Sequence, residues 1–123
     1  MFINFSNHPS QIWSREQTDA ARGYGAIVDV PFPAVPPDAS EEEIQGMAEQ
    51  SCMQIASVIE GVKGEEPSAV HIMGEMTLTY AIVSRLLKRG VCCMASTTTR
   101  EVTTDNNGNK ISVFRFVRFR QYA

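Results

Sequence analysis

Short apolar segments alternate with helix-forming segments along most of this chain. Each apolar segment is four or five residues long, and helix-start signals follow the first three. This alternation favours a parallel sheet with helices on its faces, because parallel strands need a crossover connection. The length of 123 residues fits one domain. We therefore expect a single α/β, Rossmann-like domain over residues 1–123, with parallel strands at residues 2–5, 26–30, 69–73 and 91–95.

Three helices are expected between these strands. Ser14 and Ser40 each begin a capping-box pattern, which predicts a helix start. The second helix has the clearest apolar stripe, and Gly61 and Gly64 predict where it ends. The expected helices cover residues 14–22, 40–61 and 77–89.

The last part of the chain changes character. Residues 97–104 and 111–119 are rich in β-branched or aromatic side chains, and the turn-forming residues 105–109 separate them. This pattern predicts a C-terminal antiparallel β-hairpin. Apolar side chains fall on both faces of its second strand, so we expect both faces to be partly covered.

Composition and cysteine spacing limit the class of protein. A hydrophobic fraction of 43% and a charged fraction of 20% are typical of globular proteins. No apolar run approaches the ~20 residues of a membrane span, and the first residues lack a signal-peptide pattern. The three cysteines are odd in number and two are adjacent, a poor framework for disulfides. We therefore expect a cytoplasmic protein that needs no metal or other cofactor.

The net charge of −3 conceals an asymmetry between two halves of the chain. Residues 1–75 carry three basic and twelve acidic residues, whereas residues 76–123 carry eight basic and two acidic ones. Either the basic half binds an anion, or acidic helices and a basic hairpin neutralise each other across the fold. Arg115, Arg118 and Arg120 have the same two possible uses, in a ligand cleft or in ion pairs.

Candidate ligand-binding residues lie where the four predicted strands end. In an open parallel sheet, ligands bind beyond the carboxyl ends of the strands. Loops at these ends are rich in hydroxyl and small polar groups, which suit phosphate. The candidates are Ser6, Asn7 and His8 after the first strand, Phe32 after the second, Gly74, Glu75, Thr77 and Thr79 after the third, and Thr97, Thr98, Thr99 and Arg100 after the fourth.

Several candidates also have a structural interpretation. Gly74 either lets a ligand approach the backbone ahead of a helix N-terminus or serves as a turn residue. Thr77 is either a hydroxyl donor or a helix N-cap, and Arg100 either binds phosphate or is an exposed strand residue. His8 suits acid–base chemistry, or it belongs to a turn before a proline. His71 lies within the third strand, and we expect it to be a core residue. No P-loop, GxGxxG, GxSxG or HExxH motif occurs.

Four segments together resemble a known family: FINFSNHP at residues 2–9, HIMGEMTLTY at 71–80, ASTTTREV at 95–102 and SVFRFVRFR at 112–120. They resemble small, single-domain CRISPR-associated proteins of the ring nuclease type, which have a CARF-like Rossmann fold and accompany type III CRISPR systems. The resemblance extends over nearly the whole chain.

This resemblance implies a function. Proteins of this kind bind cyclic oligoadenylate, a small cyclic RNA second messenger, as homodimers, and some cleave it and switch off type III CRISPR signalling. Cleavage needs no metal, because a ribose 2′-hydroxyl attacks the adjacent phosphate. We expect His8, Glu75 and Arg100 to be catalytic, the other candidates to contact the ligand, and neither a membrane nor duplex nucleic acid to be a partner. Two alternatives remain: a non-catalytic binder of the same messenger, or a Rossmann-like module for another nucleotide or a protein partner.

Overall fold

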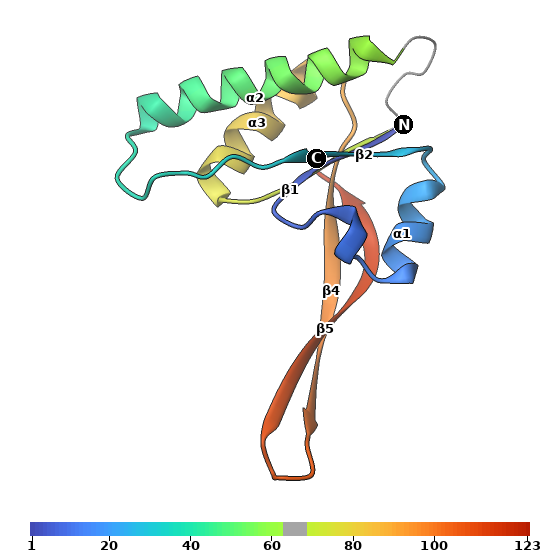
Figure 1. The fold of residues 1–123 in the computed structure, drawn as a ribbon. Coiled ribbons are helices and arrows are strands. Elements are labelled where there is room, and N and C mark those ends of the chain that lie inside the picture. The colour runs from blue at the N-terminus through green and yellow to red at the C-terminus, as the bar shows by residue number, and fades with distance from the viewer. Residues whose placement is uncertain (63–68) are drawn as a thin grey trace.

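One five-stranded sheet organises residues 1–62 and 69–123, the part of the chain that the computed structural model describes (Figure 1). The strand order is β2-β1-β3-β4-β5, with parallel pairing up to β4 and antiparallel pairing between β4 and β5. This confirms the predicted Rossmann-like α/β sheet with its C-terminal antiparallel hairpin. The elements are β1 (Phe2–Ser6), η1 (Ser10–Ile12), α1 (Arg15–Arg22), β2 (Ile27–Pro31), α2 (Glu41–Gly61), β3 (Ala69–Met73), α3 (Met76–Lys88), β4 (Cys93–Thr104) and β5 (Lys110–Gln121).

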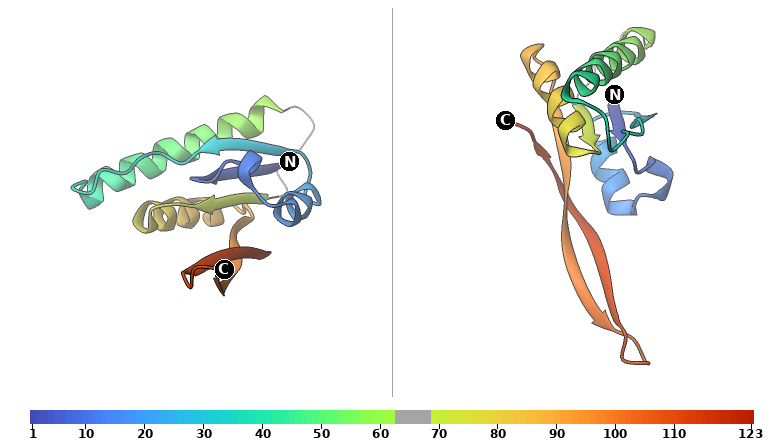
Figure 2. Two further views of the ribbon diagram at one scale, coloured as in Figure 1. Left: turned by 60° about the horizontal axis from the view of Figure 1, so that its bottom comes forward. Right: turned by 90° about the vertical axis from the view of Figure 1, so that its left-hand side faces the viewer.

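Helices cover the two faces of the sheet unequally (Figure 2). On one face Ile3 packs into the larger core cluster with Ile55 of α2 and Leu78 of α3. On the other face Phe2 packs into a smaller cluster with Ala21 of α1. Neighbouring residues of a strand point to opposite faces, which explains this division. Because α1 has only 8 residues and α2 has 21, part of the α1 face extends beyond its helix.

The first two helices begin where their capping patterns predict. The Ser14 hydroxyl accepts a hydrogen bond from the backbone N–H of Gln17 at 3.2 Å, and the Ser40 hydroxyl accepts one from Glu43 at 3.1 Å. Each contact satisfies an N–H that has no partner within the helix. The second helix ends at Gly61 as predicted, and Gly64 lies outside the described residues.

Strand β4 is longer than the sequence predicted. We expected a strand over residues 91–95, a strand-end loop at residues 96–100 and a first hairpin arm over residues 97–104, but one strand, β4, runs unbroken from Cys93 to Thr104. The predicted loop therefore lies inside a strand that pairs with β5, with one irregularity in the ladder between Thr97 and Thr98. Threonine is β-branched and fits an extended backbone, which is the physical reason for the difference.

The β4–β5 hairpin projects beyond the rest of the sheet (Figure 1). Phe114 pairs with Arg100 and Val113 pairs with Glu101, so the two apolar side chains lie on opposite faces. They are 66% and 40% exposed, respectively. The expectation that both faces of the hairpin are partly covered is therefore wrong for its distal half.

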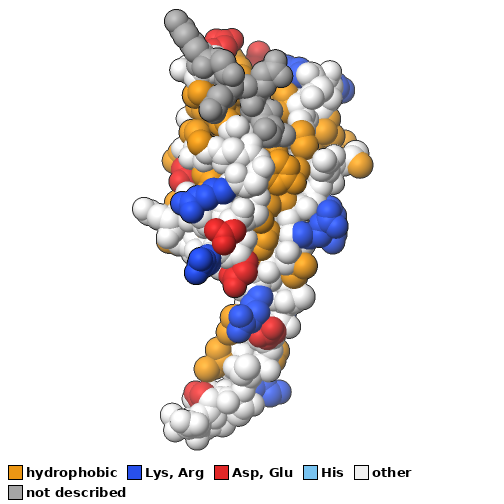
Figure 3. All heavy atoms as spheres, turned by 90° about the vertical axis from the view of Figure 1, so that its right-hand side faces the viewer, with side chains coloured by type: hydrophobic (Ala, Val, Ile, Leu, Met, Phe, Trp, Pro, Cys, Tyr) orange, Lys and Arg blue, Asp and Glu red, His pale blue; other side chains and the backbone are white. Residues whose placement is uncertain are grey.

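Among the described residues, no ion pair joins an acidic helix to the basic hairpin. Within residues 1–62 and 69–123 the ion pairs are Arg15–Asp19, inside α1, and Arg115–Glu101, inside the hairpin. Helix α2, which carries acidic residues in its first turn, lies far from the tip of the hairpin (Figure 1). Figure 3 shows Lys and Arg side chains beside hydrophobic ones along the hairpin. Among the described hairpin residues, Arg115 is therefore paired with Glu101, whereas Arg100, Lys110, Arg118 and Arg120 make no ion pair.

The remaining expectations from composition concern membranes and cysteines. Across the described ranges, no helix combines the length and the apolar character needed to cross a membrane. Cys52, Cys92 and Cys93 are free thiols. Burial, with the two nearby thiols, raises the pKa of Cys93 to about 12. A thiol that stays protonated is a poor nucleophile.

Candidate functional site

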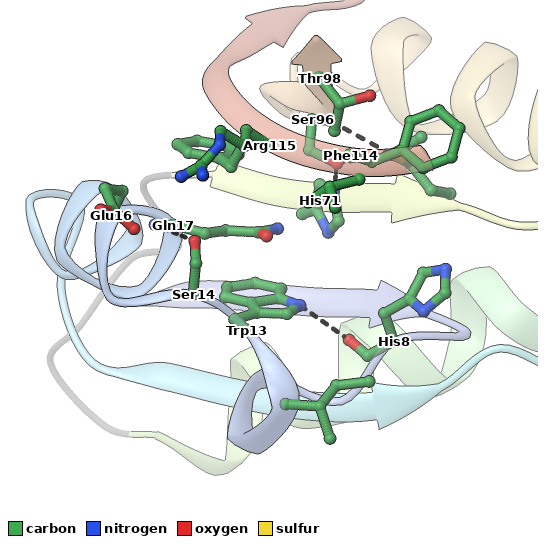
Figure 4. A pocket seen from close by; sticks show the side chains of 14 residues that line it. His8, Trp13, Ser14, Glu16, Gln17, His71, Ser96, Thr98, Phe114 and Arg115 are labelled. Atoms are coloured by element: carbon green, nitrogen blue, oxygen red, sulfur yellow. Dashed lines mark hydrogen bonds between the residues drawn. The ribbon is translucent and has the colours of Figure 1, made fainter. Parts of the chain in front are cut away.

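A cavity of about 730 Å³ lies between the η1–α1 segment and the β4–β5 hairpin. It reaches the carboxyl ends of β1 and β3, where His8 and Met73 line it. Figure 4 shows side chains of η1 and α1 on one side and side chains of β4 and β5 on the other. The volume falls within the range of small-molecule sites, roughly 300–1,000 Å³. Its lining includes the polar residues His8, Gln17, Ser96, Thr98 and Arg115 and the aromatic residues Trp13, Phe114 and Phe116.

The structure divides the predicted site residues among separate hollows. His8 and Thr98 line the large cavity. Gly74 and Thr79 line a second cavity of about 330 Å³, and Thr77 lines a third of about 400 Å³. Of these three cavities, the one of about 730 Å³ contains histidine side chains, and the other two do not.

Gly74 and Phe32 pack against each other. Phe32 is buried, and a Cβ added at Gly74 would lie 2.5 Å from an atom of the Phe32 ring. A glycine at position 74 therefore leaves room for this ring. The contact supports a packing role for both residues, where the sequence had indicated contact with a ligand.

Glu75 caps helix α3. Its carboxylate accepts hydrogen bonds from the backbone N–H groups of Thr77 at 3.1 Å and Leu78 at 2.8 Å, and from the Thr77 hydroxyl at 2.7 Å. The N-cap is therefore Glu75 and not Thr77, as one interpretation of the sequence had it. The bonds from Leu78 and Thr77 lower the pKa of Glu75, which makes its carboxylate a weaker base.

The predicted residues of β4 lie along the hairpin. Arg100 bonds the Ser112 hydroxyl at 3.0 Å on an exposed part of the hairpin. The Thr97 hydroxyl donates to the backbone carbonyl of Arg118 at 3.1 Å, and Thr99 pairs with Arg115 across the ladder. The arginine that lines the large cavity is Arg115, for which the sequence had left two uses open, in a ligand cleft or in an ion pair. It lines the cavity and also pairs with Glu101 at 2.7 Å.

A row of polar side chains crosses three strands beneath this cavity. Asn4 of β1 is directly in register with Asp29 of β2 and with His71 of β3. The Asn4 amide donates to Asp29 Oδ1 at 2.7 Å, and Asn4 Oδ1 lies 2.9 Å from His71 Nδ1. His71 Nε2 then lies 3.2 Å from the hydroxyl of Ser96, which lines the cavity. We call Asp29, Asn4, His71 and Ser96 the polar row.

The loop after β1 is tied to this row. The Ser6 hydroxyl donates to Asn4 Oδ1 at 2.7 Å, which gives Ser6 a structural partner. The backbone carbonyl of His8 accepts from the Asn4 amide at 2.9 Å and from the Trp13 indole at 3.0 Å (Figure 4). These contacts fix the backbone beside His8, while Asn7 is exposed next to it.

Sequence reasoning missed most of the polar row, although a signal for it exists. Each of the three strands has a single strongly polar residue in the middle of an otherwise mostly apolar segment: Asn4, Asp29 and His71. A buried polar group needs a partner, so three isolated ones invite the hypothesis that they bond each other. The strand order, which the sequence does not give, was needed to align them.

Comparison with known proteins identifies a protein family that matches this chain. A model described as "Uncharacterized protein MJ1673 family" matches residues 1–120. The chain belongs to the MJ1673 family. Searches among curated proteins and among solved structures found no match to this family member.

The buried histidine of this MJ1673-family chain predicts a pH dependence of stability. Burial, with a contribution from His8, lowers the pKa of His71 from 6.5 to about 4. The unfolded chain therefore binds a proton at a higher pH than the folded chain, so acid favours unfolding. We expect the free energy of unfolding to fall by about 3 kcal/mol as the pH drops from 6.5 to about 4.

Urea denaturation across this pH window measures the effect. In the His71→Gln variant the slope should largely disappear, whatever its stability at neutral pH. Burial raises the pKa of the Asp29 carboxyl, but hydrogen bonds from Ser10 and Asn4 outweigh it and leave that pKa below 3.8. Asp29 therefore titrates below the window, and an unchanged slope in His71→Gln would contradict the assignment to His71.

Proposed function

We propose that this protein binds cyclic oligoadenylate in the large cavity and cleaves it without a metal ion. The observation that carries the proposal is the lining of the cavity, which combines Arg115 and His8 with the rings of Trp13 and Phe116. Cationic groups suit phosphates, and aromatic faces stack on bases. The resemblance to CARF-like ring nucleases supports the same ligand.

The proposed reaction is an attack of a ribose 2′-hydroxyl on the adjacent phosphorus. A bond forms between the 2′-oxygen and phosphorus, the bond to the 5′-oxygen breaks, and a linear oligonucleotide with a cyclic 2′,3′-phosphate results. Protonated His8 gives its proton to the leaving 5′-oxygen, and the proton of the attacking hydroxyl passes to water. Arg115 balances the charge on the phosphate oxygens, the role first expected of Arg100. Loss of the messenger would switch off type III CRISPR signalling.

The proposed working form is a homodimer. In a dimer with a two-fold axis, each protomer supplies one cavity, and the two related cavities match the symmetry of a cyclic ligand. The exposed apolar side chains of the hairpin support this, because an isolated two-stranded ribbon is only marginally stable in water. In such a dimer the hairpin of one protomer would be covered by its partner.

A single-turnover assay tests the proposed function. Protein in excess is mixed with cyclic tetra-adenylate in EDTA, and the products are separated by liquid chromatography with mass detection. We expect linear fragments that end in a cyclic 2′,3′-phosphate. His8→Ala should slow cleavage by about 100-fold, because general-acid catalysis contributes roughly that much or more.

The controls separate the alternatives. Arg115→Ala should weaken both binding and cleavage, while Arg22→Ala, on an exposed part of α1, removes the same charge and should change neither. An intact ring that co-elutes with the protein would make it a non-catalytic binder. If cyclic tetra-adenylate and cyclic hexa-adenylate both stay free, the proposal is overturned and another nucleotide or a protein partner takes its place.

A further inference from the structure

The orientation of the Asn4 amide is fixed by its neighbours. Its nitrogen lies 2.7 Å from Asp29 Oδ1 and 2.9 Å from the carbonyl oxygen of His8, and both of these atoms only accept hydrogen bonds. The amide oxygen must therefore face the other way, toward the Ser6 hydroxyl and His71. With Asn4 1% exposed, no solvent competes for these positions.

This orientation determines the tautomer of His71. Asn4 Oδ1 is an acceptor 2.9 Å from His71 Nδ1, so Nδ1 carries the hydrogen and donates it. The ring is 2% exposed, and its burial favours the neutral form. A neutral ring with a hydrogen on Nδ1 has none on Nε2. His71 Nε2 is therefore an acceptor, and it faces the Ser96 hydroxyl at 3.2 Å.

The Ser96 hydroxyl consequently has no hydrogen to offer to a ligand. It has one hydrogen and two acceptors on the protein side, His71 Nε2 at 3.2 Å and the Met73 sulfur at 2.9 Å. His71 and Met73 line the cavity themselves, and whichever of the two receives the hydrogen, it is held by a protein acceptor. The lone pairs of Ser96 Oγ remain for a group inside the cavity, which Ser96 lines.

We propose that Ser96 Oγ accepts a hydrogen bond from a donor on the ligand, and that this donor is a ribose 2′-hydroxyl. This inference rests on the proposed function and specifies one contact within it. A phosphate oxygen opposite Ser96 would place two acceptors against each other, so the phosphates lie toward Arg115 and His8 instead. Asp29, Asn4 and His71 act through Ser96 as positioning residues, and together they select a ribonucleotide ring over a ring that lacks the 2′ donor.

Two cyclic tetra-adenylates test this contact, one with natural riboses and one with fluorine at every 2′ position. Fluorine is similar in size to the hydroxyl but cannot donate a hydrogen bond. The affinity of each ring is measured by rapid mixing, before cleavage proceeds. We expect wild-type protein to bind the natural ring about tenfold more tightly, the size of one neutral hydrogen bond. In Ser96→Ala this preference should shrink to about twofold or less.

The matched control is Thr98→Val, which removes a different hydroxyl from the same cavity and should keep the tenfold preference. If wild-type protein binds both rings equally, the contact proposed for Ser96 is overturned while the proposed function stands. A preference that persists in Ser96→Ala overturns it as well. If neither ring binds, the proposed function fails and this inference fails with it.

A measurement without ligand examines the same chain of contacts. Heteronuclear NMR of the histidine rings should show His71 with a hydrogen on Nδ1 and none on Nε2 at neutral pH. A hydrogen on Nε2 would make the Ser96 hydroxyl the acceptor of that hydrogen bond. This result would contradict the inference whether or not the cyclic oligoadenylate binds.

Discussion

Replacing Asn4 by aspartate is expected to destabilise the fold by about 3–5 kcal/mol at neutral pH, the range for an uncompensated buried charge. The new carboxylate would lie where the Asn4 amide now donates to Asp29 at 2.7 Å and to the carbonyl of His8 at 2.9 Å. Two donors would be lost and two like charges brought together. Chemical denaturation measures the loss as a lower midpoint at unchanged slope.

A matched control separates the effect of burial at position 4 from the effect of adding a negative charge. Asn7→Asp makes the same change three residues away on an exposed loop, and we expect it to alter stability by less than about 0.5 kcal/mol. Acid should narrow the difference between Asn4→Asp and wild type, because a protonated carboxyl regains a donor. Equal stability of the two variants would mean that the polar row contributes little to the fold.

Replacing Phe114 by serine is expected to weaken the proposed homodimer by at least about tenfold in Kd. Phe114 is 66% exposed at the distal part of the hairpin, and exposed aromatic residues often dominate the affinity of an interface. Sedimentation of wild-type protein over a range of concentrations should show a dimer, and the variant should sediment increasingly as a monomer.

Tyr80→Ser is the control for this prediction. Tyr80 lies on α3 and is 77% exposed, so the variant removes a comparable aromatic ring from another surface. We expect it to remain dimeric. If Tyr80→Ser dissociates the dimer and Phe114→Ser does not, the interface lies on α3. A monomeric wild-type protein would contradict the dimer itself.

Local signals made much of the fold predictable. The capping serines Ser14 and Ser40 act over three residues, and the turn around Gly108 joins neighbouring strands, so both can be recognised within one short window. The continuity of β4 between the two predicted strands was missed because hydroxyl-rich residues occur both in loops and in strands. The ladder with β5 decides between them, and it is a tertiary feature.

The candidate site was less predictable for the same reason. The rule that ligands bind at strand ends led to His8 and Thr98, which line the large cavity. Glu75 and Gly74 satisfied the same rule, but their contacts with the α3 backbone and with Phe32 depend on how the elements pack. His71 was correctly expected to be buried. Its link to Ser96 depends on strands that are adjacent in space and separated along the chain.

The position of β1 has a consequence for synthesis of the protein. Within residues 1–123 this strand is made before the other strands, yet it lies between β2 and β3, and its side chains are buried throughout. Pairing between segments distant in the chain forms late, because closing a long loop costs entropy. A growing chain therefore carries an unprotected apolar strand until β3 has been made. We expect a chaperone that binds short apolar segments to hold this nascent chain by Phe2–Ser6, and not by the local β4–β5 hairpin.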